Sequence, residues 1–308
     1  MLPNKATVES VADAMAVAEV QGRSLWADAR KRFLANKAAL VSLFLLIGVA
    51  LFSIFGNLIA QYAPDYVDFT LMGANAYKGV PSIETGHYFG TDTSGRDLFA
   101  RTVMGTRISL LVGLIGALVA VIVGTLYGAT AGYFGGRTDG IMMRIVDVLM
   151  SIPFMFVLIL MLVIFGRSIS MLFLGIGLIS WLDMARIARG QTLTIKNKEF
   201  VEMAHAIGVH PIKIILRHIV PNLLGIVIVY ATLLVPTMII FESFISFLGL
   251  GVQEPATSLG ALINEGSSTM QRGFYWQIGF PIFFFVITIF AFFFVGDGLR
   301  DALDPKDR

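Results

Sequence analysis

Glu242 is the residue whose type and position most directly suggest membrane chemistry, because it lies in an apolar run at about 223–248 with no Lys or Arg within one helical turn. A lone carboxylate inside a membrane is costly to bury and marks a candidate functional site. Pro236 would bend the same helix and free a carbonyl group near the middle of the membrane. We therefore predict that Glu242, Pro236 and Ser243 line a translocation pathway. The alternative is a buried structural acid bonded to Ser243, Ser246 or a neighbouring backbone group.

The sequence lacks the residue patterns of nucleotide binding and of hydrolysis. It has no GxxxxGK[ST] loop, no HExxH helix and no GxSxG turn. Its histidines, His87, His205, His210 and His218, are too scattered for a metal cluster, and the absence of cysteine excludes thiolate ligands and disulfides. We therefore expect no catalytic, metal or cofactor site, so active transport must draw energy from a partner or an ion gradient.

The segment 196–222, KNKEFVEMAHAIGVHPIKIILRHIVPN, is polar and basic although apolar runs flank it. Its apolar residues recur at helical spacing in two groups, Phe200, Ala204 and Ile207, then Ile212, Leu216, Ile219 and Val220. Gly208 and Pro211 interrupt this pattern, which predicts two short helices joined by an elbow. An apolar stripe on a loop that projects from a membrane needs a partner, so we expect this segment to dock on another protein.

The elements that position these residues are membrane-spanning helices. The chain is 56% hydrophobic with a mean hydropathy of +0.79, which is too apolar for a soluble domain. Its apolar runs of about twenty residues match the hydrocarbon core of a bilayer, and they lack the period-two alternation of a barrel. We predict an all-α polytopic membrane protein with six transmembrane helices at about 39–61, 108–131, 141–165, 168–185, 223–248 and 276–296.

The distribution of Lys and Arg fixes the orientation. With the N-terminus inside, seventeen of the 23 lie in internal segments and five in external ones, with Arg107 at a span edge. This asymmetry predicts that both termini are cytoplasmic. The expected divisions are an N-terminal cytoplasmic segment 1–38 without a signal peptide, a first helix 39–61, an external loop 62–107, a five-helix core 108–296 with a cytoplasmic loop 186–222, and a tail 297–308.

Two pairs of opposite charges lie near the predicted cytoplasmic ends of spans. Arg144 and Asp147 are three residues apart on one helix, as are Asp183 and Arg186 on another. Pairs at this spacing can neutralise each other locally, with Arg reaching toward the interface. We expect this structural pairing, and contact with a substrate is the alternative.

A stripe of small residues follows the second predicted span. Its members recur at every fourth position, which lets two helix backbones approach closely in lipid: Gly116, Ala120, Gly124, Gly128 and Gly132. The stripe predicts a tightly packed helix. The contact is either with another helix of this chain or with a second subunit.

The spacing within the 196–222 segment resembles the signature loop of bacterial ABC importer permeases, which reads Glu-Ala-Ala, three residues, Gly, nine residues, Ile, one residue, Leu-Pro. Matches occur at Glu202, Ala204, Gly208 and Pro221, and departures at Met203, His218 and Val220. The ending RHIVPN resembles the peptide-importer branch. Further stretches resemble the permease C subunits of the oligopeptide and dipeptide family: SLWADARKRF at 24–33, GTDTSGRDLFAR at 90–101, ESFISFLGLG at 242–251 and GDGLRDALDPK at 296–306.

The resemblance implies a type I ABC importer permease fold in a bacterial inner membrane, a non-catalytic role and no nucleic-acid partner. It implies an assembly with a homologous second permease, two cytoplasmic ATPase subunits and a periplasmic or surface peptide-binding protein. The helix around Glu202, Ala204 and Gly208 would couple to an ATPase, and Pro221 would mark the junction with the fifth span.

The similarity is to the oligopeptide branch in particular, which implies that this chain forms half of the translocation pathway of an ATP-driven oligopeptide importer. Three alternatives to an oligopeptide importer stay open. The same architecture could carry dipeptides, glutathione or metal chelates. A secondary transporter could use Glu242 as an ion site, although no matching halves are evident. An intramembrane enzyme would need a nucleophile–base or metal constellation, which the sequence does not show. For the N-terminal segment, we expect a helix along the membrane surface with Leu25, Trp26 and Phe33 toward the lipid.

Overall fold

The computed structural model describes residues 25–303, and this part of the chain is mainly helical. Five of its helices are long and apolar enough to cross a membrane, and a bent pair makes six if the pair counts as one span. The prediction of an all-α polytopic membrane protein is therefore confirmed.

The long helices are α3 (Lys37–Ile59), α4 (Leu98–Phe134), α7 (Ile169–Ile195), α10 (Val220–Phe247) and α12 (Tyr275–Leu303). The shorter ones are α2 (Leu25–Ala35), α5 (Gly136–Ser151), α6 (Phe154–Phe165), α8 (Glu199–Ala206), α9 (Pro211–Ile214) and α11 (Leu259–Thr269). Helix α4 begins at Leu98 rather than at 108, because the carboxylate of Asp97 caps it by accepting a hydrogen bond from the Ala100 amide at 2.8 Å. Its 37 residues span about 55 Å, so it extends well beyond the hydrocarbon core.

The predicted third span is broken. Helices α5 and α6 are bent by 76° at Ile152 and Pro153, instead of forming one continuous helix over 141–165. Proline lacks a backbone N–H and disfavours helical geometry at the residue before it, and Ile152 accordingly has an extended backbone with φ −85° and ψ 124°. The break therefore has a local cause in the sequence.

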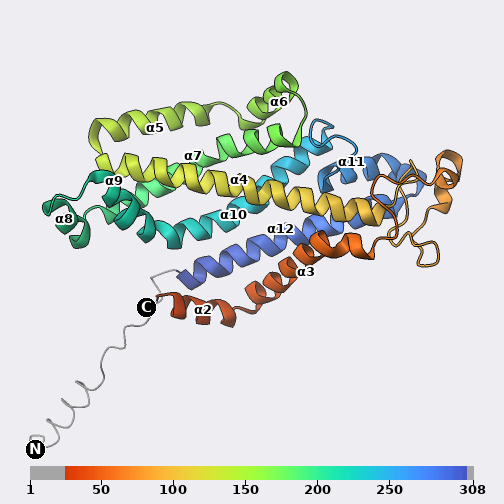
Figure 1. Cartoon of the computed structure of the whole chain (residues 1–308), viewed down its shortest axis with the longest axis horizontal. Helices are drawn as coiled ribbons and strands as arrows, with labels where there is room; N and C mark the ends of the chain where they lie inside the picture. Colours follow the sequence, from red (N-terminus) through yellow and green to blue (C-terminus); the bar gives the residue numbers. More distant parts are fainter. Residues whose placement is uncertain (1–24, 304–308) are drawn as a thin grey trace, which may run out of the picture.

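The helices form layers around α4 (Figure 1). Helices α5 and α6 run along one side of the bundle, and α2, α3 and α12 lie on the opposite side, with α4, α7 and α10 between them. Helices α8 and α9 lie at one end of the bundle, whereas α11 and the loop before α4 lie at the other. This arrangement places the predicted cytoplasmic loop and the predicted external loop at opposite ends.

The stripe of small residues on α4 packs against α7 of the same chain. A Cβ atom on Gly128 would lie 2.2 Å from the carbonyl oxygen of Ala185, and one on Gly124 would lie 2.6 Å from that of Trp181. Gly132 faces Thr192 in the same way, and Ala120 is fully buried. These contacts support the alternative of packing within one subunit.

Two ion pairs join α5 to α7. Arg186 donates to Asp147 at 2.5 Å, and Arg189 makes two bonds to Asp139 at 2.5 and 3.0 Å. Asp147 was predicted to pair with Arg144, and Arg186 with Asp183, each within one helix. This is wrong for Asp147 and Arg186, which bind each other across the interface between α5 and α7.

Helix α2 packs against the cytoplasmic end of α12. The ring of Phe33 lies 3.3 Å from the position of a Cβ atom on Gly298, so this residue contacts protein. Phe33 is thus half-buried against α12, and the expectation that its free side meets lipid stays a prediction. The side chains of Leu25 and Trp26 lie outside the described residues.

Candidate functional site

The cytoplasmic loop contains the two short helices that the sequence predicts. Gly208, between α8 and α9, has a φ of +78°, a conformation that glycine adopts without strain. Pro211 occupies the first turn of α9, where its missing N–H costs nothing. A π-helical turn, Ile215–Ile219, then leads directly into α10, with Pro221 in its first turn. The elbow is thus confirmed, and the second helix continues into a membrane span.

The two faces of this loop differ in exposure. Val201 and Ala204 are buried against a core cluster that includes Ile214 and Ile219. The exposed large apolar side chains are Phe200 at 38%, Met203 at 63%, Ile207 at 80%, Ile212 at 58% and Leu216 at 50%, and Glu202 is also exposed. The apolar residues of this loop therefore form a buried side, which fixes the loop to the bundle, and a free side.

Glu242 is fully buried at the contact of three helices. Its carboxylate accepts hydrogen bonds from Ser109 of α4 at 2.9 Å, from Ser243 at 3.2 Å and from Ser246 at 2.6 Å. The hydroxyl of Ser109 also accepts a bond from the amide of Leu259, the first residue of α11. This geometry matches the structural alternative for Glu242.

Pro236 lies in the same helix and is buried. Helix α10 is continuous through it, unlike the α5–α6 pair at Pro153. Ser243 is also buried, and its backbone lies 2.4 Å from the position of a Cβ atom on Gly260 of α11. Glu242 and Ser243 are therefore brought together at the α10–α11 contact, but neither has a free surface within this chain.

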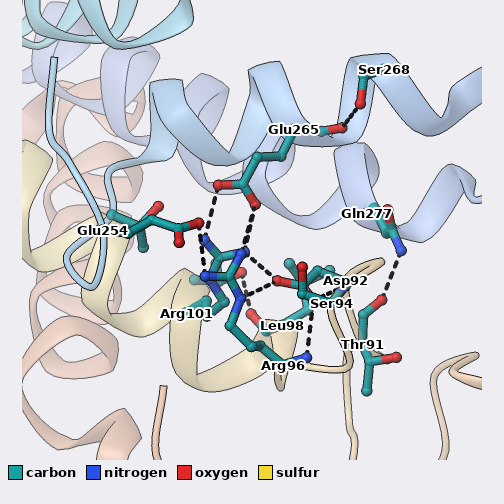
Figure 2. A network of polar contacts seen from close by, with 12 residues as sticks. Thr91, Asp92, Ser94, Arg96, Leu98, Arg101, Glu254, Glu265, Ser268 and Gln277 are labelled. Atoms are coloured by element: carbon teal, nitrogen blue, oxygen red, sulfur yellow. Dashed lines mark hydrogen bonds and ion pairs between the residues drawn. The ribbon is translucent and has the colours of Figure 1, made fainter. Parts of the chain in front are cut away.

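A network of charges joins α4 to α11 at the external end (Figure 2). The guanidinium of Arg101, which is only 2% exposed, donates to Asp92 at 2.5 Å and to both carboxylate oxygens of Glu265 at 2.5 and 2.9 Å. Asp92 also accepts bonds from the amides of Ser94 and Arg96. Two oxygens in a fixed fork match the planar donors of arginine, which makes this a strong and directional contact.

The same network extends to the segment that follows α10. Arg96 donates to Asp92 at 2.7 Å and to Glu254 at 2.8 Å, and Thr91 accepts a bond from Gln277 of α12 at 2.9 Å (Figure 2). Sequence reasoning noticed the GTDTSGRD stretch but assigned it no contacts. Two arginines and two aspartates within ten residues indicate a cluster of ion pairs, but the glutamates that Arg96 and Arg101 bind lie more than 150 residues further along the chain.

Next to the network, His87 and Asp97 form a buried pair. The imidazole Nδ1 lies 2.9 Å from an Asp97 carboxylate oxygen, and Tyr62 stacks on the imidazole with ring centres 4.4 Å apart. Burial raises the pKa of Asp97, while the Ala100 amide and His87 act in the opposite direction. These contacts hold the external loop against the start of α4.

Two family models match the chain. A model described as "Binding-protein-dependent transport system inner membrane component" matches residues 120–308, and one described as "N-terminal TM domain of oligopeptide transport permease C" matches residues 24–76. The chain belongs to the first of these families. It is a transmembrane permease subunit of an ABC importer and a multi-pass protein of the bacterial inner membrane. Such a permease works with an ATPase and a binding protein.

Curated relatives match over nearly the whole chain. The oligopeptide transport system permease protein OppC of Escherichia coli K12 is 54% identical over 305 residues, covering 99% of this chain and 98% of the relative. OppC of Haemophilus influenzae is 52% identical over 301 residues, covering 98% and 95%. The dipeptide permease DppC of Bacillus subtilis is 43% identical over 281 residues, covering 91% and 86%.

Among solved structures, the MetNI methionine ABC transporter in inward-facing conformations matches with a TM-score of 0.53 at 18% identity. The match covers 66% of this permease and 95% of that chain. At this identity the likeness shows the fold alone, and it confirms the ABC importer permease fold.

Proposed function

We propose that α8 and α9 of this permease dock on a cytoplasmic ATPase, in an assembly with a homologous second permease, two ATPases and a peptide-binding protein. The observation that carries the proposal is the free apolar side of the loop, formed by Met203, Ile207 and Ile212. These residues lie at the end of the bundle that the distribution of Lys and Arg predicts to be cytoplasmic, and exposed apolar surface outside the membrane marks a protein contact. A short helix that presents apolar residues fits a groove on a partner.

The buried side of the loop explains how a docked ATPase would move the membrane helices. Val201 and Ala204 belong to the same buried apolar cluster as Ile214 and Ile219. The segment from Pro211 onward, which carries Ile214 and Ile219, runs without interruption into α10. Closure of the ATPases moves rigid bodies against each other, and packed elements transmit that motion. A displacement of α8 would therefore be passed to α10 through side-chain contacts as well as through the backbone.

The docking proposal is tested with two residues of equal exposure at opposite ends of the bundle. Ile207 and Phe69 are each 80% exposed, so replacing either by Glu removes no internal packing. We expect Ile207→Glu to reduce copurification of the ATPase at least tenfold, and Phe69→Glu to leave it unchanged. Wild-type copurification with Ile207→Glu would show that this surface is not the docking site.

The elbow is tested at Gly208. Because its φ is +78°, Gly208→Asp strains the turn and adds a charge beside the docking surface. We expect the variant to insert normally and to lose ATP-dependent uptake. Gly225→Ala is the matched control, since this position in α10 has a negative φ and no atom within 4 Å of the added Cβ. Normal uptake by the Gly208 variant would rule out a coupling role.

We propose that the cargo is oligopeptides. The support is the identity of 52–54% with two permeases named for oligopeptide transport. In Bacillus subtilis, the permeases named for oligopeptides and for dipeptides match this chain about equally, at 41% and 43%. The test is competition for uptake in cells that express the complete importer, with unlabelled peptides of two to five residues. We expect peptides of three to five residues to compete more strongly than dipeptides. Stronger competition by dipeptides would indicate the dipeptide alternative.

For Glu242, we propose a structural role in joining α4, α10 and α11. The support is that Glu242 is completely buried among serine hydroxyls of α4 and α10. One of these hydroxyls, that of Ser109, also accepts a hydrogen bond from the start of α11. A role as an ion site would instead make uptake sensitive to an uncoupler and independent of the ATPase. We expect uptake to survive the uncoupler while ATP is maintained and to stop when the ATPase is inactivated.

A further inference from the structure

The break between α5 and α6 interrupts the predicted third span, and the residues at the break lie on the surface of the bundle. Ser151, Ile152 and Pro153 are all exposed, with Ile152 at 46% and Phe156 in the first turn of α6 at 72%. The first amide groups of any α-helix have no partner within the helix, and no side chain caps α6. The amides of Ile152 and Phe156 donate to the carbonyls of Leu149 and Pro153, so the groups that need partners from outside this chain are the remaining first amides of α6 and the last carbonyls of α5.

The break lies beside the interior of the span α10, not at its end. Phe154, the first residue of α6, packs on Phe241 of α10 with ring centres 4.8 Å apart. Phe241 precedes the external end of α10 by six residues, which corresponds to about 9 Å along a helix. The following turns of α6 bury Leu158 and Leu162 in an apolar cluster with Ile176 of α7.

Lipid is a poor cover for such a site. Irregular backbone at membrane depth occurs where protein buries it or where it lines a water-filled cavity, because hydrocarbon offers no hydrogen-bond partner. The opposite side of the bundle differs in this respect. Helices α3 and α12 are uninterrupted there (Figure 1). A shallow groove between them is lined mainly by apolar residues such as Val41, Leu45 and Phe290. Lipid can cover that side without meeting a break in a helix.

Charged residues also distinguish the side of the bundle formed by α5 and α6 from the side formed by α3 and α12. The Asp147–Arg186 pair joins α5 to α7, and both side chains are about half exposed, at 50% and 48%. Arg144 and Asp183 are also exposed on these two helices. Ionisable residues in membrane segments face a bundle interior or a water-filled cavity. A polar route therefore extends along α5 from its cytoplasmic half toward the break.

We propose that the α5–α6 break faces the aqueous translocation pathway that this permease shares with the second permease subunit. The proposal rests on the two-permease assembly proposed above and names the segment of this chain that borders the cargo. Exposed backbone at Ser151 and Ile152 would meet water or the main chain of a passing peptide. Main-chain groups are the same in all peptides, so this contact does not depend on the cargo's side chains.

The test uses the absence of cysteine from the natural sequence, which makes every introduced thiol unique within this chain. Ser151→Cys and Ile152→Cys are compared with Val41→Cys and Phe290→Cys, whose positions are 59% and 57% exposed on the opposite side. The complete importer is kept in membrane vesicles and treated with a charged methanethiosulfonate, which reacts with the thiolate. A thiol ionises in water but stays protonated in hydrocarbon. Uptake by each variant before labelling shows that it has folded.

We expect the thiols at 151 and 152 to react at least tenfold faster than those at 41 and 290, and modification at 151 to block uptake. Equal rates at all four positions would overturn the proposal, and so would an unreactive thiol at 151 in a variant that transports normally. The ATPase copurification test separates this result from failure of the docking proposal. A complex that binds its ATPase through α8 but leaves position 151 unreactive contradicts only the pathway assignment.

Discussion

Replacing Arg101 by Met should destabilise the external end of the permease more than any single change at a neighbouring exposed charge. Arg101 is 2% exposed and is the shared partner of Asp92 and Glu265. Removing one member of a buried ion pair costs about 3–5 kcal/mol, because the other charge stays buried. Asp92 keeps its bond to Arg96, and Glu265 is 39% exposed and can be hydrated, which places the expected cost near the lower limit, at about 3 kcal/mol.

The measurement is the melting midpoint of the detergent-purified importer at a fixed scan rate, since membrane complexes unfold irreversibly. For a chain of this length, about 2 °C corresponds to 1 kcal/mol, so Arg101→Met should lower the midpoint by about 6 °C. Glu254→Gln is the control, because its carboxylate is 66% exposed and its ion pair with Arg96 is worth at most about 1 kcal/mol.

A double variant, Arg101→Met with Glu265→Gln, sharpens the test. It removes the unpaired carboxylate that the single change leaves behind, so part of the lost stability should return. The reasoning is refuted if Arg101→Met melts within 2 °C of the wild type. It is also refuted if Glu254→Gln is equally damaging, because burial would then not determine the strength of these contacts.

Three further predictions concern residues in and next to α4. Gly128→Ala should lower the melting midpoint by about 2–6 °C, because its Cβ would collide with the Ala185 carbonyl, whereas Gly190→Ala, with free space around it, should not. Glu242→Gln should retain uptake with a small loss of stability; normal melting with abolished uptake would instead assign Glu242 to the pathway. Burial raises the pKa of Asp97 above 3.8, so the folded state binds a proton at this carboxyl more readily than the unfolded state does. The melting midpoint of the wild type should therefore rise relative to that of Asp97→Asn as the pH falls through the raised pKa toward 3.8. A difference in midpoint that does not change with pH would contradict this.

The membrane-spanning helices could be predicted from the sequence because hydropathy sums over about twenty residues and tolerates local errors. The elbow of the cytoplasmic loop was equally accessible, since Gly208 and Pro211 act through their own backbone geometry. Pro153 carried the same kind of signal, but the apolar run around it favoured one continuous span. A proline inside a hydrophobic run breaks the helix at Pro153 but leaves it continuous at Pro236, so the outcome depends on the packing of the neighbouring helices.

Contacts between distant segments could not be predicted. Asp147 was expected to pair three positions away, yet Arg186 of another helix reaches it, because spacing along one helix says nothing about a neighbour's side chains. The partner of Arg101 in α11 was invisible for the same reason. The division of the cytoplasmic loop into a buried and a free apolar side could not be predicted either, because a single sequence does not show which side of a short helix meets the bundle.

The positions of these contacts along the bundle bear on how force from an ATPase would travel. At the predicted cytoplasmic end, Ala204 lies in the same buried apolar cluster as Ile219, the residue that directly precedes α10. Near its other end, α10 binds α4 through Glu242 and Ser109, and the same serine binds the start of α11. Because each contact joins a different pair of helices, α10 cannot shift without displacing α4 and α11 or breaking buried hydrogen bonds. We therefore expect α4, α10 and α11 to move together, leaving the broken α5–α6 pair as the place where the pathway can change shape.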